Sequence, residues 1–137
     1  MGTSFVNLQV RHIDVAKVEA LCPHCISRAW TEGWVTVVGE ALERAGVQRE
    51  AKRLSKALAA PVLSVEYVDD DYLELALYCG GRRVFRHIPA PYEDILRQQG
   101  KAEPLIKALE LSDKTAKKLR TVLREQRAEV TVKLFEC

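Results

Sequence analysis

The sequence predicts one α+β domain built on a mainly antiparallel sheet. Segments of alternating apolar and polar residues predict strands, and they dominate the first 90 residues. Apolar residues at helical spacing dominate the remainder. The expected order is β-α-β-α-β-β-β, followed by C-terminal helices from about residue 91 and a final strand. Because strands and helices separate along the chain, we expect the helices to lie on one face of the sheet.

The N-terminal elements are predicted from alternation, capping residues and prolines. The segment FVNLQVR alternates as a half-buried strand does. Asp14 is a suitable helix N-cap, and the missing backbone donors of Pro23 and Pro61 should end helices. The expected elements are a strand at 5–11, a helix from Asp14 to Pro23, a hairpin of 27–30 with 34–38, and a helix bearing Val47, Ala51, Leu54 and Leu58.

The middle of the chain predicts an antiparallel meander, and the end predicts helices. Turn residues at 69–71 and 80–81 separate three alternating segments. On the second of these, Cys79 shares a face with three leucines, so we expect it to be buried. The predicted strands are 62–68, 72–79, 83–88 and 129–135, and the predicted helices are 92–99, 103–110 and 113–126.

Composition limits the classes of function. The chain has 137 residues, 47% of them hydrophobic, which suits one domain with its own core. Its 21 basic and 19 acidic residues give no strong overall field toward nucleic acid or anionic lipid. No run approaches the roughly 18 apolar residues of a membrane helix, and the start lacks a signal-peptide pattern. We therefore expect a cytoplasmic chain with no membrane partner and no cofactor. Its four cysteines are expected to be free thiols, redox groups or metal ligands rather than structural disulfides.

The segment Cys22-Pro23-His24-Cys25 is the main candidate for chemistry. A C-x-x-C pair is reactive when its first cysteine caps a helix N-terminus, because the helix dipole favours the thiolate. Pro23 suits the first helical position, which would make Cys22 the N-cap. The alternative is that both cysteines are small buried apolar residues at the end of a helix.

The same four residues are identical to the active-site tetrapeptide of the disulfide-forming branch of the thioredoxin-like family. The resemblance implies a thiol-disulfide oxidoreductase using Cys22 and Cys25, with Pro61 as the cis-proline that faces the dithiol. In that family the dithiol almost directly follows a strand, whereas residues 12–21 intervene here. A zinc site would need two further ligands beside Cys22 and Cys25, and no second close pair exists in the sequence. We therefore predict no metal site.

Residues 105–119 resemble a helix-turn-helix in their apolar spacing. The resemblance implies nucleic-acid binding through Lys114, Lys117, Lys118 and Arg120 on the second helix. Glu110 stands where that motif usually has glycine. The alternative is a pair of amphipathic surface helices with solvated charges, and nucleic acid is not the partner we favour.

A third candidate is an aromatic surface on the sheet. It comprises Tyr72, Tyr78, Arg83 and His87. Aromatic and arginine residues dominate the energetics of protein interfaces. We predict a protein without catalytic activity that binds another protein, or a second copy of itself, through this face or through its basic C-terminal helices. Oxidoreductase and nucleic-acid binding functions remain as alternatives.

Overall fold

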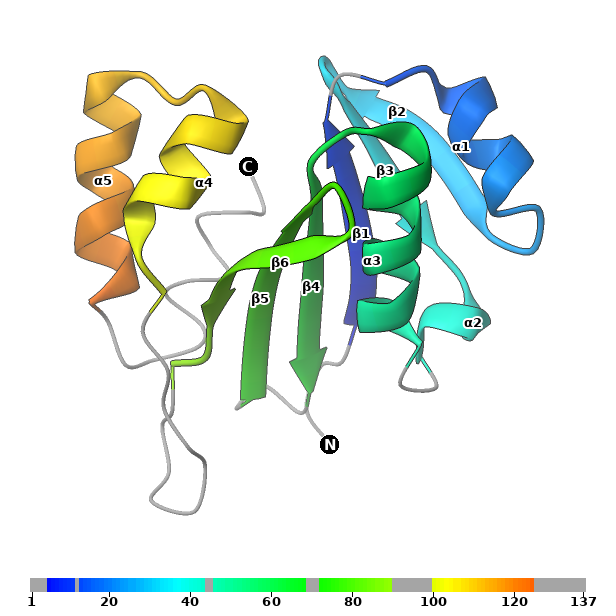
Figure 1. Ribbon diagram of the computed structural model, residues 1–137. Helices are drawn as coiled ribbons and strands as arrows, with labels where there is room; N and C mark the ends of the chain where they lie inside the picture. Colours follow the sequence, from blue (N-terminus) through cyan, green and yellow to red (C-terminus); the bar gives the residue numbers. More distant parts are fainter. Residues whose placement is uncertain (1–4, 12, 44–45, 69–71, 90–99, 125–137) are drawn as a thin grey trace.

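The computed structural model describes residues 5–11, 13–43, 46–68, 72–89 and 100–124. In these residues an antiparallel sheet lies between two layers of helices, with α3 on one side and the pair α4 and α5 on the other (Figure 1). The strands are β1 (Phe5–Arg11), β2 (Ile26–Thr31), β3 (Trp34–Val38), β4 (Val62–Val68), β5 (Tyr72–Cys79) and β6 (Arg82–His87). The helices are α1 (Val15–Leu21), α2 (Glu40–Glu43), α3 (Val47–Leu58), α4 (Ala102–Leu109) and α5 (Asp113–Leu123).

The order across the sheet is β2-β3-β1-β4-β5-β6. Every neighbouring pair is antiparallel, so β1 pairs with β3 on one side and with β4 on the other. The edge strands among the described residues are therefore β2 and β6. Local hairpins build the two ends of the sheet, and β1 joins them.

Helices α1, α2 and α3 cover one face of the sheet. Leu8 and Val10 of β1 point to this face and pack with Val18 of α1 and Leu54 of α3, all fully buried. The amphipathic stripe of α3 lies over β4 and β5, as the spacing of its apolar residues requires.

Helices α4 and α5 cover the other face. Leu75 and Leu77 of β5 contact a cluster that includes Leu105 of α4 and Leu119 of α5. The expectation that all helices lie on one face is therefore wrong. Strand β5 is buried on both faces, because its alternate residues, Glu74 among them, are also shielded from solvent.

The predicted α+β class and the mainly antiparallel sheet are confirmed. The central strands 62–68 and 72–79 begin and end where the alternation predicts, and the expected hairpin of 27–30 with 34–38 is β2 paired with β3. The short helix α2 was not predicted. The expected helix at 92–99 and the expected strand at 129–135 lie outside the described residues.

Candidate functional site

The cysteine pair lies in the turn between α1 and β2. Cys22 is the C-terminal cap of α1, and its backbone N–H donates to the carbonyl of Val18 at 2.9 Å. The N–H of Cys25 donates to the carbonyl of Cys22 at 3.1 Å, and β2 begins at the next residue. The reactive arrangement requires Cys22 at a helix N-terminus, but the structure places it at the opposite end. A helix C-terminus carries partial negative charge, which disfavours a thiolate.

Two charged residues of α3 contact the Cys22 thiol. Cys22 is 4% exposed, its S–H donates to Glu50 Oε2 at 3.8 Å, and Arg53 Nη2 donates to its sulfur at 3.4 Å. Arg53 also donates to the carbonyl of Leu21 at 2.8 Å and to Glu50. Burial, followed by the Cys25 thiol, raises the pKa of Cys22 to about 11; Glu50 adds to this effect and Arg53 opposes it. Cys22 is therefore a neutral thiol at physiological pH.

The second thiol, Cys25, is half-buried against the end of β3. Burial raises its pKa, and a hydrogen bond with the Cys22 side chain opposes that change. Gly39 provides the space for this approach, because a Cβ at that position would lie 3.2 Å from Cys25 Sγ. Both sulfurs are thus packed between α1, α3 and the sheet.

The cis-proline that the resemblance implies at Pro61 is not found in the described structure. No cis peptide bond occurs in the described residues, so the bond to Pro61 is trans. The carbonyl of Pro61 accepts a hydrogen bond from Arg11 N at 3.0 Å. Cys79 packs with the cluster on the opposite face of the sheet from Cys22. Across the described ranges, no group of three His, Cys, Asp or Glu side chains could hold a metal ion.

The four residues of the predicted aromatic surface do not form one surface. Tyr78 is buried beneath α3, and its hydroxyl donates to Gln48 Oε1. His87 is fully buried and its Nδ1 accepts from the backbone N–H of Gly100 at 3.1 Å. Arg83 is exposed and Tyr72 is half-buried. His87 pairs with Leu75 and so lies on the face opposite Tyr78, because the pairing of β5 with β6 shifts near Tyr78. The alternation could indicate neither this shift nor the helices that cover both faces.

Sequence reasoning missed a buried ionic cluster around Glu74. This carboxylate is 6% exposed, accepts from Arg86 Nε at 2.9 Å and accepts from the hydroxyl of Tyr72 at 2.6 Å. Glu66 lies directly across from Glu74 on β4, and burial together with Glu74 raises its pKa. Desolvation and the negative charge of Glu74 raise the pKa of Tyr72. Among the described residues, Glu74, Arg86 and Tyr72 thus form a hydrogen-bonded ionic network within the sheet. The only sign of it in the sequence was a glutamate in an apolar strand.

Helices α4 and α5 form the pair that resembles a helix-turn-helix. Glu110 caps α4 in the left-handed conformation with φ 53°, and Ser112 caps α5 by accepting from the backbone N–H of Thr115. The apolar faces of both helices pack on the sheet. The residues predicted to contact phosphates are all exposed: Lys114, Lys117, Lys118 and Arg120.

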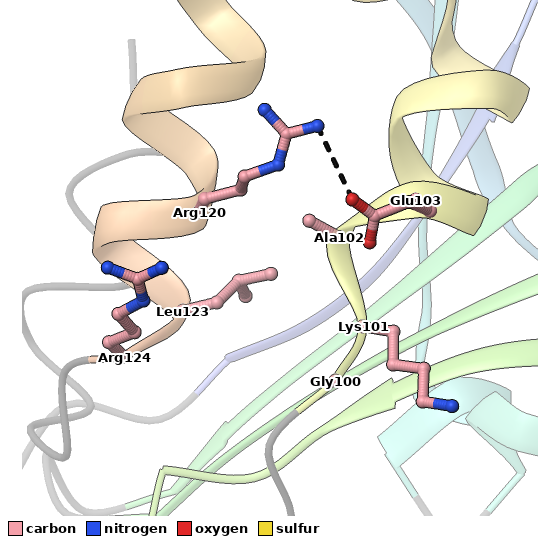
Figure 2. Close-up of a pocket in the computed structure, with 7 residues that line it drawn as sticks. All are labelled: Gly100, Lys101, Ala102, Glu103, Arg120, Leu123 and Arg124. Carbon is pink, nitrogen blue, oxygen red and sulfur yellow. Dashed lines mark hydrogen bonds and ion pairs between the residues drawn. The ribbon is translucent and has the colours of Figure 1, made fainter.

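A pocket of about 310 Å³ lies between the start of α4 and the end of α5 (Figure 2). Arg120 Nη2 donates to Glu103 Oε1 at 3.3 Å, which offsets part of the positive charge. The side chain of Lys101 extends away from this pair, so the cations that line the pocket do not converge on one point (Figure 2). The pocket therefore offers no focused anion site.

The edge strand β2 carries the two most exposed large apolar side chains in the described chain. Trp30 is 69% exposed and Ile26 is 54% exposed. The pairing of β2 with β3 shifts between Arg28 and Thr31, so Ala29 and Trp30 together lie opposite one residue of β3. Such a bulge redirects side chains at a sheet edge. Exposed aromatic and aliphatic residues on an edge strand are typical of an interaction site.

Comparison with known proteins adds no relative: no family model, no curated protein and no solved structure matches the chain significantly. In the part of the chain that the structure describes, no helix combines the length and the hydropathy needed to cross a membrane.

Proposed function

We propose that this chain is a non-catalytic, cytoplasmic protein-binding domain whose binding surface is the outer edge of β2. The observation that carries the proposal is the exposure of Trp30 and Ile26 on a strand that pairs with β3 alone among the described strands. An edge strand can accept a further strand through its backbone groups, while pockets and apolar contacts select the partner. Trp residues contribute disproportionately to binding energy at interfaces.

The environment of the cysteines argues against the alternative of redox catalysis. A nucleophilic cysteine needs a depressed pKa and an accessible sulfur. Cys22 has a raised pKa and is 4% exposed. In a reducing cytoplasm both thiols would remain packing groups that hold the start of β2 against α1 and α3.

The test of the proposed function compares three versions of the full chain as bait. The wild type, Trp30→Lys on β2 and Val84→Lys on the opposite edge strand are each used for affinity capture from cytoplasmic extract. Both substituted side chains are exposed, so neither change disturbs the core. A protein retained by the wild type and by Val84→Lys but lost with Trp30→Lys, and then shown to bind the purified wild type, supports the proposal. Identical capture by all three baits contradicts it.

A second candidate function is phosphate-backbone binding by α5. Lys114, Lys117 and Lys118 are exposed and lie at helical spacing, and so they form one basic face. Retention on duplex DNA that falls steeply with salt, and that Lys117→Gln with Lys118→Gln reduces, supports this function. No retention at low salt excludes it.

A further inference from the structure

The exposed side chains at the start of β2 lie on one face of the sheet. Residues 26–28 pair with residues 36–38 in unbroken register, and the pairing shifts only after Arg28. Ile26 and Arg28 therefore share one face, and Ser27 between them points to the other. Ser27 is 1% exposed and α1 packs against β2, whereas Ile26 is 54% exposed and Arg28 is exposed. The open face of β2 thus presents one apolar and one cationic side chain.

Two arginines on this face are not paired with a carboxylate of the described residues. Arg28 lies opposite Thr36 of β3, and Arg11 of β1 lies opposite Trp34 on the same face of β3. Arg28 donates to the carbonyl of Ser27 at 2.9 Å. Arg11 stacks on the ring of Trp34 at 4.9 Å, and its buried Nε has no hydrogen-bond partner in the described structure. Because the sequences of β1, β2 and β3 contain no acidic residue, this part of the sheet carries a net positive charge.

A strand that adds to the β2 edge would place its own side chains beside Ile26 and Arg28. Directly opposed residues of neighbouring strands have Cβ atoms about 5 Å apart, where opposite charges attract and like charges repel. Because side chains two positions apart share a face, the complement of β2 is a strand with an apolar and an acidic residue at that spacing. The apolar side chain distinguishes this complement from a nucleic acid, whose phosphates would match the arginines alone.

We propose that the β2 edge binds an extended acidic segment of another protein, with a carboxylate beside Arg28 and an apolar side chain beside Ile26. This inference rests on the proposed function and names the chemistry of the partner. Backbone hydrogen bonds would join the segment to β2, and the charge of Arg28 and Arg11 would select an acidic sequence. Trp30, 69% exposed near the end of the strand, would add a further apolar contact.

Selection from a phage library of random peptides, with the full chain as the immobilised target, tests the inference. Peptides that the wild type retains should contain Asp and Glu more often than the unselected library, each two positions from an apolar residue. Arg28→Glu should reverse the preference toward Lys and Arg, because a carboxylate then replaces the guanidinium. Arg82→Glu, an exposed change on β6, is the matched control and should select acidic peptides as the wild type does. Selection of no peptide, or an acidic preference that is absent or that Arg28→Glu leaves unchanged, overturns the inference.

A double-mutant cycle with one selected peptide tests the contact with Arg28 directly. In fluorescence anisotropy, Arg28→Gln should weaken binding of the acidic peptide about two- to fivefold, and should not change binding of the same peptide with Gln in place of its acidic residue. This difference should shrink at high salt. Equal weakening of both peptides overturns the contact.

The outcomes separate this inference from the proposed function. Peptides that Trp30→Lys loses but that show no acidic preference refute the inference and leave the proposed function standing. A wild type that selects no peptide but binds a single-stranded oligonucleotide through Arg28 also refutes the inference. If neither a selected peptide nor a captured protein depends on Trp30, both are refuted.

Discussion

The reactivity of Cys22 is the property that separates a packed thiol pair from a redox site. Its pKa is about 11 against an ordinary value of 9.0. At pH 8 the thiolate fraction is then about 0.1%, compared with about 10% for an unperturbed thiol. We therefore predict that iodoacetamide modifies Cys22 at least about tenfold more slowly than an unstructured cysteine peptide, because the higher nucleophilicity of a more basic thiolate offsets part of the difference in thiolate fraction. Shielding of the sulfur should slow the reaction further.

Two substitutions on α3 should change this rate in opposite directions. Glu50→Gln removes a carboxylate that raises the pKa of Cys22, so alkylation should become faster. Arg53→Met removes a cation that lowers the pKa, so alkylation should become slower. Lys52→Gln, an exposed change on the same helix, is the matched control and should have little effect. The assay is residue-resolved mass spectrometry from pH 7 to pH 11. A Cys22 rate at pH 8 equal to or above the peptide rate would refute the reasoning.

Three further changes test the packing of the described core. Gly100→Ala places a Cβ 2.4 Å from Cε2 of Phe85, and we expect urea denaturation to show a loss of about 1–3 kcal/mol in unfolding free energy. Arg86→Met removes the guanidinium that pairs with the buried Glu74, which should cost about 1.5–3 kcal/mol in the same assay. Because folding raises the pKa of Glu66, the folded state loses stability as pH rises from the unfolded value of 4.5 through the folded value. The stability of Glu66→Gln relative to the wild type should therefore be higher in a thermal melt at pH 7 than in one at pH 4. A loss in unfolding free energy below about 0.5 kcal/mol for Gly100→Ala or Arg86→Met would contradict the first two expectations. A wild type that becomes more stable relative to Glu66→Gln as the pH rises would contradict the third.

The strands could be predicted from the sequence because their signals are local. The alternation of 62–68 and 72–79, with turn residues between them, determines a hairpin without reference to the rest of the chain. The order of strands across the sheet could not be predicted, because β1 pairs with residues more than 20 positions away on both sides. The sequence did not indicate that helices cover both faces of the sheet, because the charge of Glu74 suggested a face exposed to solvent. In the structure Glu74 forms a buried ion pair on that face.

The cysteine segment shows how one local signal can favour two opposite placements. Pro23 suits the first position of a helix, and it also suits the residue after a helix has ended. The structure has the second arrangement, because α1 ends at Leu21 and Cys22 caps its C-terminus. The exposure of Trp30 was not predictable either, since it depends on β2 being an edge strand with a bulge.

The most direct test of the proposed binding edge is hydrogen exchange along the sheet of the wild-type chain. Exchange of the backbone amides of β2 is compared with exchange in β6, in the free chain and in its complex with the captured protein. Binding at the β2 edge predicts that exchange in β2 slows in the complex, while exchange in β6 stays the same. Exchange in β2 that is the same in both states, or protection that appears in β6 instead, would contradict it.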